Sequence, residues 1–345
     1  MKQQRVMSHV LAALLLLSAV SPDGVHAFQR IRLTTLAPRG HSFHRSLQRM
    51  GEAWRDASGG SVELIIYPGG IQGGETAMVQ RMLINQAHAA LLTAAGLEEI
   101  EPAVTGLQYM PMMFRSLEEL DYVAERLQPA LEERLLAKGF VVLFWGDTGW
   151  VRFFSKDPVV HVEDLEGMKL WTTAGHLPTE AIYNESGMNP VPLETSDILT
   201  GLQTGLIDAV PMPPFFALAS QVYRPAPHML ELNWAPLVGA LVVKRDVWDG
   251  IPATVRDRML AAARQAGAEI HEAGRRESDE AVETMKTKWN LQVHPVEPGG
   301  ELEAEWRTRA EAAYPKIRGG IVPAEIFDEV QRLLQEYREA SGRSR

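Results

Sequence analysis

The stretch from Asp164 to Pro214 constrains the fold of this chain more than any other. We expect strands at Met168–Thr173, Asn189–Leu193 and Ile207–Val210, and helices at His176–Ser186 and Ile198–Thr204. Gly187 and Gly205 follow the two helices, and glycine ends helices because it readily adopts positive φ. The order β-α-β-α-β predicts a parallel sheet covered by helices.

The carboxyl ends of the predicted strands are where a ligand would bind, since open α/β sheets hold ligands at that edge. In this stretch those ends are Trp171–Thr173 and Pro211–Pro214. The beginning of the chain has the same plan, with strands expected at Gln29–Leu36, Val62–Tyr67 and Ala87–Leu92 and helices at Ser42–Asp56 and Glu75–Gln86. We therefore expect the two halves of the chain to form two similar lobes.

The remaining segments connect these two halves. We expect a helix at Leu117–Lys138, strands at Phe140–Trp145, Trp150–Phe154, Val238–Val243 and Asn290–Pro295, and a last helix at Pro323–Glu339. A very long helix is predicted from Pro252 to Lys288, weakened locally by Gly267 and Gly274.

The N-terminus has the pattern of a cleaved secretory signal peptide over residues 1–27. Lys2 and Arg5 precede the apolar run Val10–Leu17, and Val25-His26-Ala27 resembles a cleavage site. An uncleaved anchor is the alternative, but the apolar run is short for a membrane span. The chain has no cysteine and a net charge of −10, which argues against disulfides and against nucleic acid as a partner. We expect an exported protein of the periplasm.

Motifs along nearly the whole mature chain resemble the solute-binding proteins of TRAP transporters, the DctP family. The resemblance is carried by DLEGMKLW, GMNPVPL and LQTGLIDAV in the stretch described above, and by LIIYP and MPMMF before it. It implies a two-lobe periplasmic-binding-protein fold of the α/β class. Each lobe would be a mixed sheet flanked by helices, with a long helix crossing both. Lobe I would hold 28–147 plus about 239–274, and lobe II 148–238 plus about 275–322, followed by a C-terminal helix and tail at 323–345.

Signatures of enzymes are missing from the sequence. There is no G-x-S-x-G, P-loop, H-E-x-x-H or G-x-G-x-x-G pattern. We therefore expect no catalytic residue, no metal site and no cofactor.

The residue that most affects the expected ligand is Trp171. The resemblance implies an Arg here that pairs with a ligand carboxylate, whereas an indole offers an apolar face and a single N–H donor. Met212 likewise stands where relatives often have a polar ligand-binding group, and Ala94 lies at a position that is often polar or acidic. The candidate ligand-binding residues are Trp171, Arg152, Met212, Trp150, Phe215, Trp234 and Ala94.

These residues have plain structural alternatives. Aromatic and Met side chains in apolar stretches usually belong to the core. Arg152 matches a second Arg that some relatives use on the ligand, and it could equally form a salt bridge at the hinge between the lobes.

The sequence favours a periplasmic receptor that closes on a small, relatively apolar or aromatic organic ligand and delivers it to the membrane permease subunits of a TRAP transporter. One alternative is an ordinary organic-acid receptor that uses Arg152. Another is a periplasmic carrier of hydrophobic ligands or lipids that is not coupled to transport. The sequence leaves open whether an additional periplasmic helper protein docks on the receptor.

Overall fold

The computed structural model of the protein describes residues 28–342. Its strands are β1 (Gln29–Thr35), β2 (Val62–Tyr67), β3 (Ala89–Thr93), β4 (Phe140–Ser155), β5 (Lys169–Thr173), β6 (Asn189–Leu193), β7 (Ala209–Met212), β8 (His228–Lys244) and β9 (Gln292–Pro295). The predicted signal peptide, 1–27, lies outside the described residues.

The α-helices are α2 (Ser42–Ala57), α3 (Glu75–Leu83), α4 (Ala94–Leu97), α5 (Leu117–Ala137), α6 (Leu177–Glu185), α7 (Ile198–Thr204), α8 (Pro214–Ala219), α9 (Arg245–Asp249), α10 (Ala253–Trp289), α11 (Glu301–Gly320) and α12 (Ala324–Gly342). Short 3₁₀ helices occupy Pro102–Leu107, Val162–Leu165 and Thr195–Asp197. Among the described helices, none combines the length and apolar character needed to cross a membrane.

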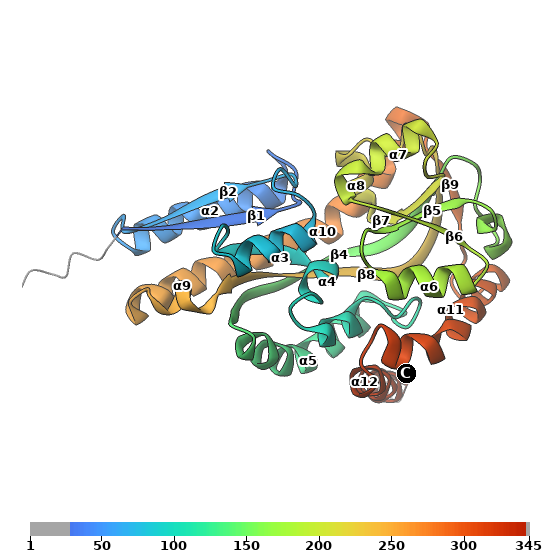
Figure 1. The fold of residues 1–345 in the computed structure, drawn as a ribbon. Coiled ribbons are helices and arrows are strands. Elements are labelled where there is room, and N and C mark those ends of the chain that lie inside the picture. The colour runs from blue at the N-terminus through green and yellow to red at the C-terminus, as the bar shows by residue number, and fades with distance from the viewer. Residues whose placement is uncertain (1–27, 343–345) are drawn as a thin grey trace, which may run out of the picture.

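The two halves of the chain form similar ends of one mixed sheet, whose order is β2-β1-β3-β8-β4-β7-β5-β6, with β9 beside β8. Within each end, β1 pairs in parallel with β2 and β3, and β5 pairs in parallel with β6 and β7. The predicted β-α-β-α-β plan is confirmed in both halves. Figure 1 shows the two ends on opposite sides of the molecule.

Two long antiparallel strands, β4 and β8, join the two ends. The prediction of separate strands at Phe140–Trp145 and Trp150–Phe154 is wrong. The chain remains paired with β8 between them, and the register shifts between Asp147 and Trp150 as in a β-bulge. The predicted strand Val238–Val243 is similarly only the last part of β8. A sheet therefore runs through both lobes without a break.

Helices cover both faces of this sheet. On one face α2 turns Phe43, Leu47, Met50 and Trp54 into a core shared with α10, as its helical spacing predicts. On the other face α5 and α12 bury a second apolar cluster.

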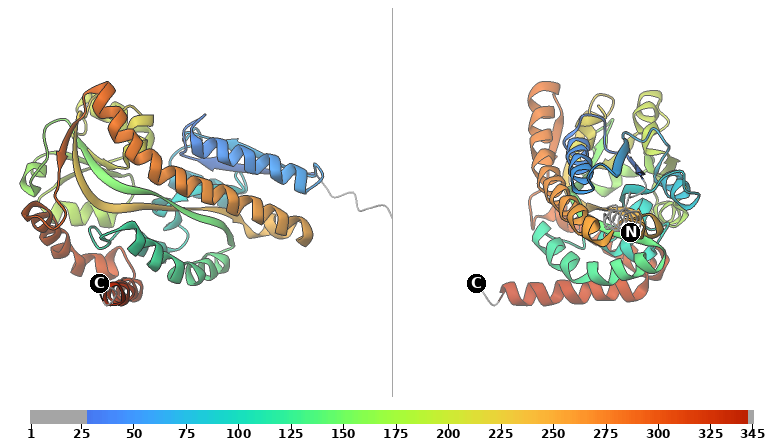
Figure 2. Two further views of the ribbon diagram at one scale, coloured as in Figure 1. Left: turned by 180° about the vertical axis from the view of Figure 1, so that it is seen from behind. Right: turned by 90° about the vertical axis from the view of Figure 1, so that its left-hand side faces the viewer.

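The long helix α10 crosses the molecule from one end to the other, packing on α2, β4 and α8 (Figure 2). It passes through Gly267 and Gly274 without interruption. A Cβ at Gly267 would lie 2.5 Å from Cγ of Phe144, and one at Gly274 would lie 2.7 Å from the carbonyl oxygen of Asp147. The two glycines therefore let the helix lie directly against β4.

Candidate functional site

A cavity of about 220 Å³ lies between the two ends of the sheet. Its lining includes residues at the carboxyl ends of β3, β5 and β7, the edge that the strand order predicts for a ligand. These are Thr93, Trp171, Thr172, Thr173, Pro211, Met212 and Pro213, and further lining comes from Val151 and from residues of α6 and α11.

Most of the wall contributed by the second half of the chain is apolar. Trp171, Met212 and Trp234 line it together with Ile182 and Met188. The indole N–H of Trp171 donates a hydrogen bond of 3.0 Å to the carbonyl oxygen of Leu193. Because an indole has a single N–H, Trp171 presents only its apolar ring to a ligand.

The wall contributed by the first half of the chain contains a buried carboxyl group, that of Glu75. It accepts hydrogen bonds from the backbone N–H of Thr93 at 2.7 Å, from the Thr93 hydroxyl at 2.5 Å and from the N–H of Gly96 at 2.9 Å. Burial raises the pKa of Glu75 despite these donors. The carboxyl group thereby holds the turn between β3 and α4 in place.

Polar contacts between the two halves of the chain border the cavity. The imidazole Nε2 of His176, the N-cap residue of α6, lies 3.0 Å from Oε1 of Glu98, and the ring of His176 stacks on Tyr109 with centroids 5.1 Å apart. Burial raises the pKa of Glu98 although His176 is its hydrogen-bond partner. The carboxylate of Glu194 lies so close to Gly74 that a Cβ atom added to Gly74 would overlap it. These contacts hold the two halves together around the cavity.

Of the seven residues predicted to bind a ligand, Trp171, Met212 and Trp234 line this cavity. Their contact with a ligand stays a prediction. The other four lie outside the lining of this cavity.

Arg152 and Phe215 have other partners. The guanidinium Nη1 of Arg152 donates to Oε1 of Glu231 on β8 at 3.2 Å, and its side chain is 13% exposed. Phe215 is 2% exposed and packs on Phe43, with ring centroids 5.0 Å apart. Of the two aromatic neighbours on α8, it is Phe216 that lines the cavity.

Ala94 and Trp150 pack against other residues of the protein and do not line the cavity. Ala94 is buried as the first residue of α4, and the adjacent Ala95 lines the cavity in its place. Trp150 packs against the apolar cluster beneath α5. Since none of the four lies in the lining, we do not retain them in the proposed site.

Arg309 is a cavity-lining residue that the sequence analysis missed. It lies on α11, a helix that local patterns do not predict, because charged residues are spread around it and Pro315 interrupts its pattern. Its start carried a usable signal, since Gly300 precedes Glu301 and Glu303, and acidic residues favour a first helical turn.

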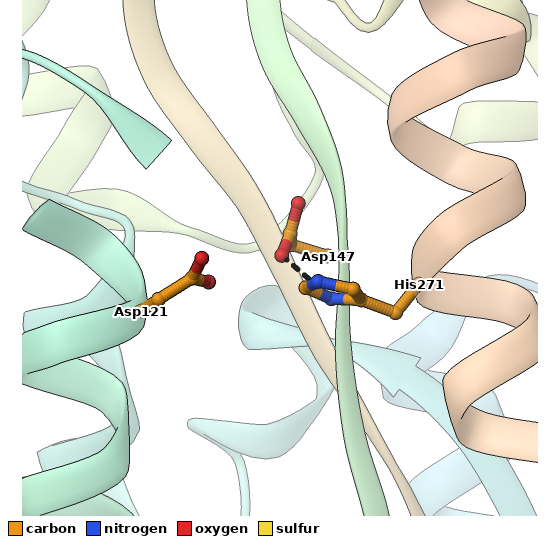
Figure 3. Close-up of side chains that lie close together, drawn as sticks. All are labelled: Asp121, Asp147 and His271. Carbon is orange, nitrogen blue, oxygen red and sulfur yellow. Dashed lines mark ion pairs between the residues drawn. The ribbon is translucent and has the colours of Figure 1, made fainter. Parts of the chain in front are cut away.

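One cluster outside the cavity has the residue types of a metal site. Ligand atoms of Asp121, Asp147 and His271 all lie within 4.8 Å of one another (Figure 3). However, Arg275 donates to both oxygens of Asp147 at 3.0 and 2.8 Å and to both oxygens of Asp121. A guanidinium therefore already neutralises these carboxylates, and the cluster is an ion-pair network linking α5, β4 and α10.

Comparison with known proteins places the chain in a family. The family model described as bacterial extracellular solute-binding protein, family 7 (DctP), matches residues 33–319. Among curated relatives, the C4-dicarboxylate-binding periplasmic protein DctP of Rhodobacter capsulatus is 27% identical over 199 residues, which cover 57% of this chain and 58% of that protein.

Solved structures agree with the fold. The sugar acid binding protein DctPAm of Advenella mimigardefordensis, in complex with galactonate, has a TM-score of 0.82 at 17% identity, covering 90% of this chain and 99% of that one. A TRAP periplasmic solute binding protein of Sulfurospirillum deleyianum with bound succinate has a TM-score of 0.77 at 22% identity, covering 90% and 99%. The predicted fold class and family resemblance are confirmed: this chain belongs to the bacterial extracellular solute-binding proteins of family 7, the DctP family.

Proposed function

We propose that this protein is the periplasmic receptor of a TRAP-type transporter and that it captures a small, relatively apolar or aromatic organic molecule. Membership of a solute-binding family and a cavity between two similar lobes support the receptor role. The membrane permease subunits of the transporter are then its partners, and export by the predicted signal peptide brings it to the periplasm.

Trp171 carries the proposal about the ligand. It lies at the carboxyl end of β5, where the family resemblance implies a carboxylate-binding Arg, and its N–H is already bonded to Leu193. An apolar ring at this position cannot replace the charge-assisted pair that a guanidinium makes with a carboxylate. It can instead cover apolar ligand surface, as cofactor and ligand pockets commonly do.

The two alternatives have less support. Arg152 lies outside the lining of the cavity and pairs with Glu231, so an organic-acid receptor built on Arg152 is not favoured. A carrier that is not coupled to transport is not favoured by membership of a family of solute-binding proteins.

Native mass spectrometry of the protein purified from its own host tests the ligand proposal. We expect an organic molecule with substantial apolar surface. The Trp171→Ala variant should bind the recovered molecule about tenfold more weakly, since losing about 60 Å² of apolar contact at ~25 cal/mol/Å² costs about 1.5 kcal/mol. Trp289→Ala, which changes a tryptophan outside the cavity lining, is the control. Recovery of a tightly bound C4-dicarboxylate would contradict the proposed ligand class.

A further inference from the structure

Two carboxyl groups, one imidazole and one guanidinium line the cavity: those of Glu75, Glu194, His176 and Arg309. His176 pairs with Glu98 at 3.0 Å, and the carboxyl group of Glu75 is hydrogen-bonded to Thr93 and Gly96. Among the described residues, Arg309 has no carboxylate within ion-pair distance. It is therefore the cavity-lining cation whose charge is not compensated by the protein.

The hydrogen bonding of Arg309 is incomplete as well. Its Nη2 donates to the carbonyl oxygen of Ser186, the residue that caps the end of α6. Its Nε is buried and has no hydrogen-bond partner. A guanidinium carries several N–H donors, and burying them without acceptors is unfavourable. The hydrogen bond that caps α6 uses one N–H group of Arg309, and the remaining N–H groups are available to a ligand.

Arg152 provides a contrast within the same chain. Its Nε is also buried without a partner, but its charge is met by Glu231. Of these two arginines, Arg309 is the one that combines an uncompensated charge with a place in the cavity wall. A partly buried cation in such a place is most stable when an anion occupies the cavity.

The rest of the wall limits how many negative charges the ligand can carry. Around Arg309 the lining is apolar or small, with Met188, Ala310 and Ala313. Glu194 lines the same cavity, and its carboxylate would repel a second anionic group. The charges therefore favour one acidic group on the ligand.

An adjoining cavity indicates where the remainder of the ligand would extend. This second cavity, of about 60 Å³, shares Leu36, Glu75, Thr93, Phe216 and Leu237 with the first. Its other walls include the apolar side chains of Phe43, Leu91 and Phe144. Apolar space thus continues beyond the main cavity, past Phe216.

We propose that Arg309 on α11 binds the carboxylate of an amphipathic monoanion, an organic acid with one charged group and an aliphatic or aromatic body that lies against Trp171 and Met212. This inference rests on the proposed function and names the chemical class of its ligand. Arg309 is then the specificity-determining cation of this receptor, on a helix instead of a strand end.

The test compares acids with uncharged analogues of the same shape. Binding of 3-phenylpropanoate and octanoate, and of their primary amides, is measured by titration calorimetry on the wild type, Arg309→Gln, Arg309→Lys and the control Arg152→Gln. Succinate tests for a second anionic subsite. We expect the wild type to prefer at least one acid over its amide by about a hundredfold, and to bind succinate more weakly than that acid.

In Arg309→Gln the preference for the acid should fall to within about threefold, whereas Arg152→Gln should keep it. Arg309→Lys keeps the charge but loses the planar fork, so an intermediate preference is expected. This variant also serves if Arg309→Gln does not fold. A role limited to capping α6 would lower the melting temperature without changing the acid-to-amide ratio.

The outcomes separate this inference from the proposed function. An acid preference that survives in Arg309→Gln, or a wild type that binds amides as tightly as acids, overturns the role of Arg309 and leaves an apolar receptor. An acid preference that is equal in wild type and Arg309→Lys overturns the role of the planar guanidinium fork. A wild type that binds neither acids nor amides contradicts the proposed ligand class, and the role of Arg309 with it. Tighter binding of succinate than of the monoacids contradicts the single anionic site.

Discussion

Two arginines, on helices α10 and α11 that follow one another in the chain, have opposite surroundings. Arg275 on α10 lies between Asp121 and Asp147 and donates to both oxygens of each carboxylate. Arg309 on α11 faces the cavity and donates to one backbone carbonyl. Neither guanidinium is fully exposed, so both need compensation for the water that they have lost.

The comparison shows that an arginine paired with carboxylates of the chain stabilises the fold, whereas an arginine without such a partner is available to bind a ligand. The network of Arg275 is complete within the chain, and it joins α10, α5 and β4 where the long helix crosses the sheet. In the part of the chain that the structure describes, no carboxylate pairs with Arg309, and we infer that a ligand compensates its charge. Breaking the first should therefore cost stability, and breaking the second should cost binding.

The largest effect on stability is expected for Arg275→Met. Among the described residues, it leaves the carboxylate of Asp147, which is 5% exposed, with the imidazole of His271 at 3.0 Å as its remaining ion-pair partner. Removing one partner of a buried pair costs about 3–5 kcal/mol, and we expect that loss in the free energy of unfolding measured with urea. Ligand affinity of the folded variant should stay within about twofold, since Arg275 is outside the cavity lining.

Arg276→Met is the matched control for this variant. Arg276 is the next residue on α10, is about half exposed and pairs only with Glu272 and Glu280 along the helix. Surface pairs of this kind contribute about 0.5 kcal/mol. Equal losses in the two variants would show that the Arg275 network does not stabilise the crossing.

A smaller loss in the free energy of unfolding is expected when a methyl group is added where α10 crosses β4 than when the ion pairs of Arg275 are removed. Gly→Ala in an exposed helix usually stabilises it by up to about 1 kcal/mol. At Gly274 a Cβ would meet the carbonyl oxygen of Asp147 at 2.7 Å and Cα of Thr148 at 3.0 Å, and backbone atoms cannot move aside cheaply. We expect Gly274→Ala to lower the free energy of unfolding by about 1–3 kcal/mol.

Thermal and urea unfolding measure this change, with Gly342→Ala as control because a Cβ there meets nothing within 4 Å. A stabilised Gly274→Ala protein would mean that α10 and β4 leave room for a methyl group where they cross.

The sequence is sufficient to predict the repeated part of the fold and not its centre. The parallel strands at both ends follow from local apolar patterns and turn residues, and Gly205 at φ +76° ends α7 as predicted. The centre differs because the segment between Trp145 and Trp150 has turn residues, Gly146 and Gly149, yet pairs with β8 on one side. Such pairing between distant segments leaves no local pattern.

The candidate site divides in the same way. Trp171 and Met212 could be placed at the cavity because each follows from a motif and a strand end. Arg309 could not be placed at the cavity from the sequence, because α11 has no clear apolar pattern and lies outside those motifs. Arg152 is a cation near a predicted strand end, but its partner Glu231 lies 79 residues away on β8.

The smallest of the three stability effects is the pH dependence of the Arg275 network. Burial by itself would raise the pKa of Asp147, but hydrogen bonds from His271 and Arg275 outweigh it and hold the pKa below the ordinary value of 3.8. The unfolded chain then binds a proton at Asp147 more readily than the folded chain does. The resulting stabilisation is fully present above pH ~4 and is lost as the pH falls through the pKa of the folded state.

Wild type and Asp147→Asn should therefore converge in acid. The side-chain amide of the variant has no charge to lose, so the free energy of unfolding of Asp147→Asn should fall less steeply below pH ~4 than that of the wild type. The other carboxylates contribute to both curves and cancel in the difference. Urea unfolding at a series of pH values measures it, and parallel curves would show that Asp147 titrates alike in both states. The same series on Arg309→Gln should run parallel to the wild type, because without a ligand Arg309 has no carboxylate partner within residues 28–342 whose titration it could shift.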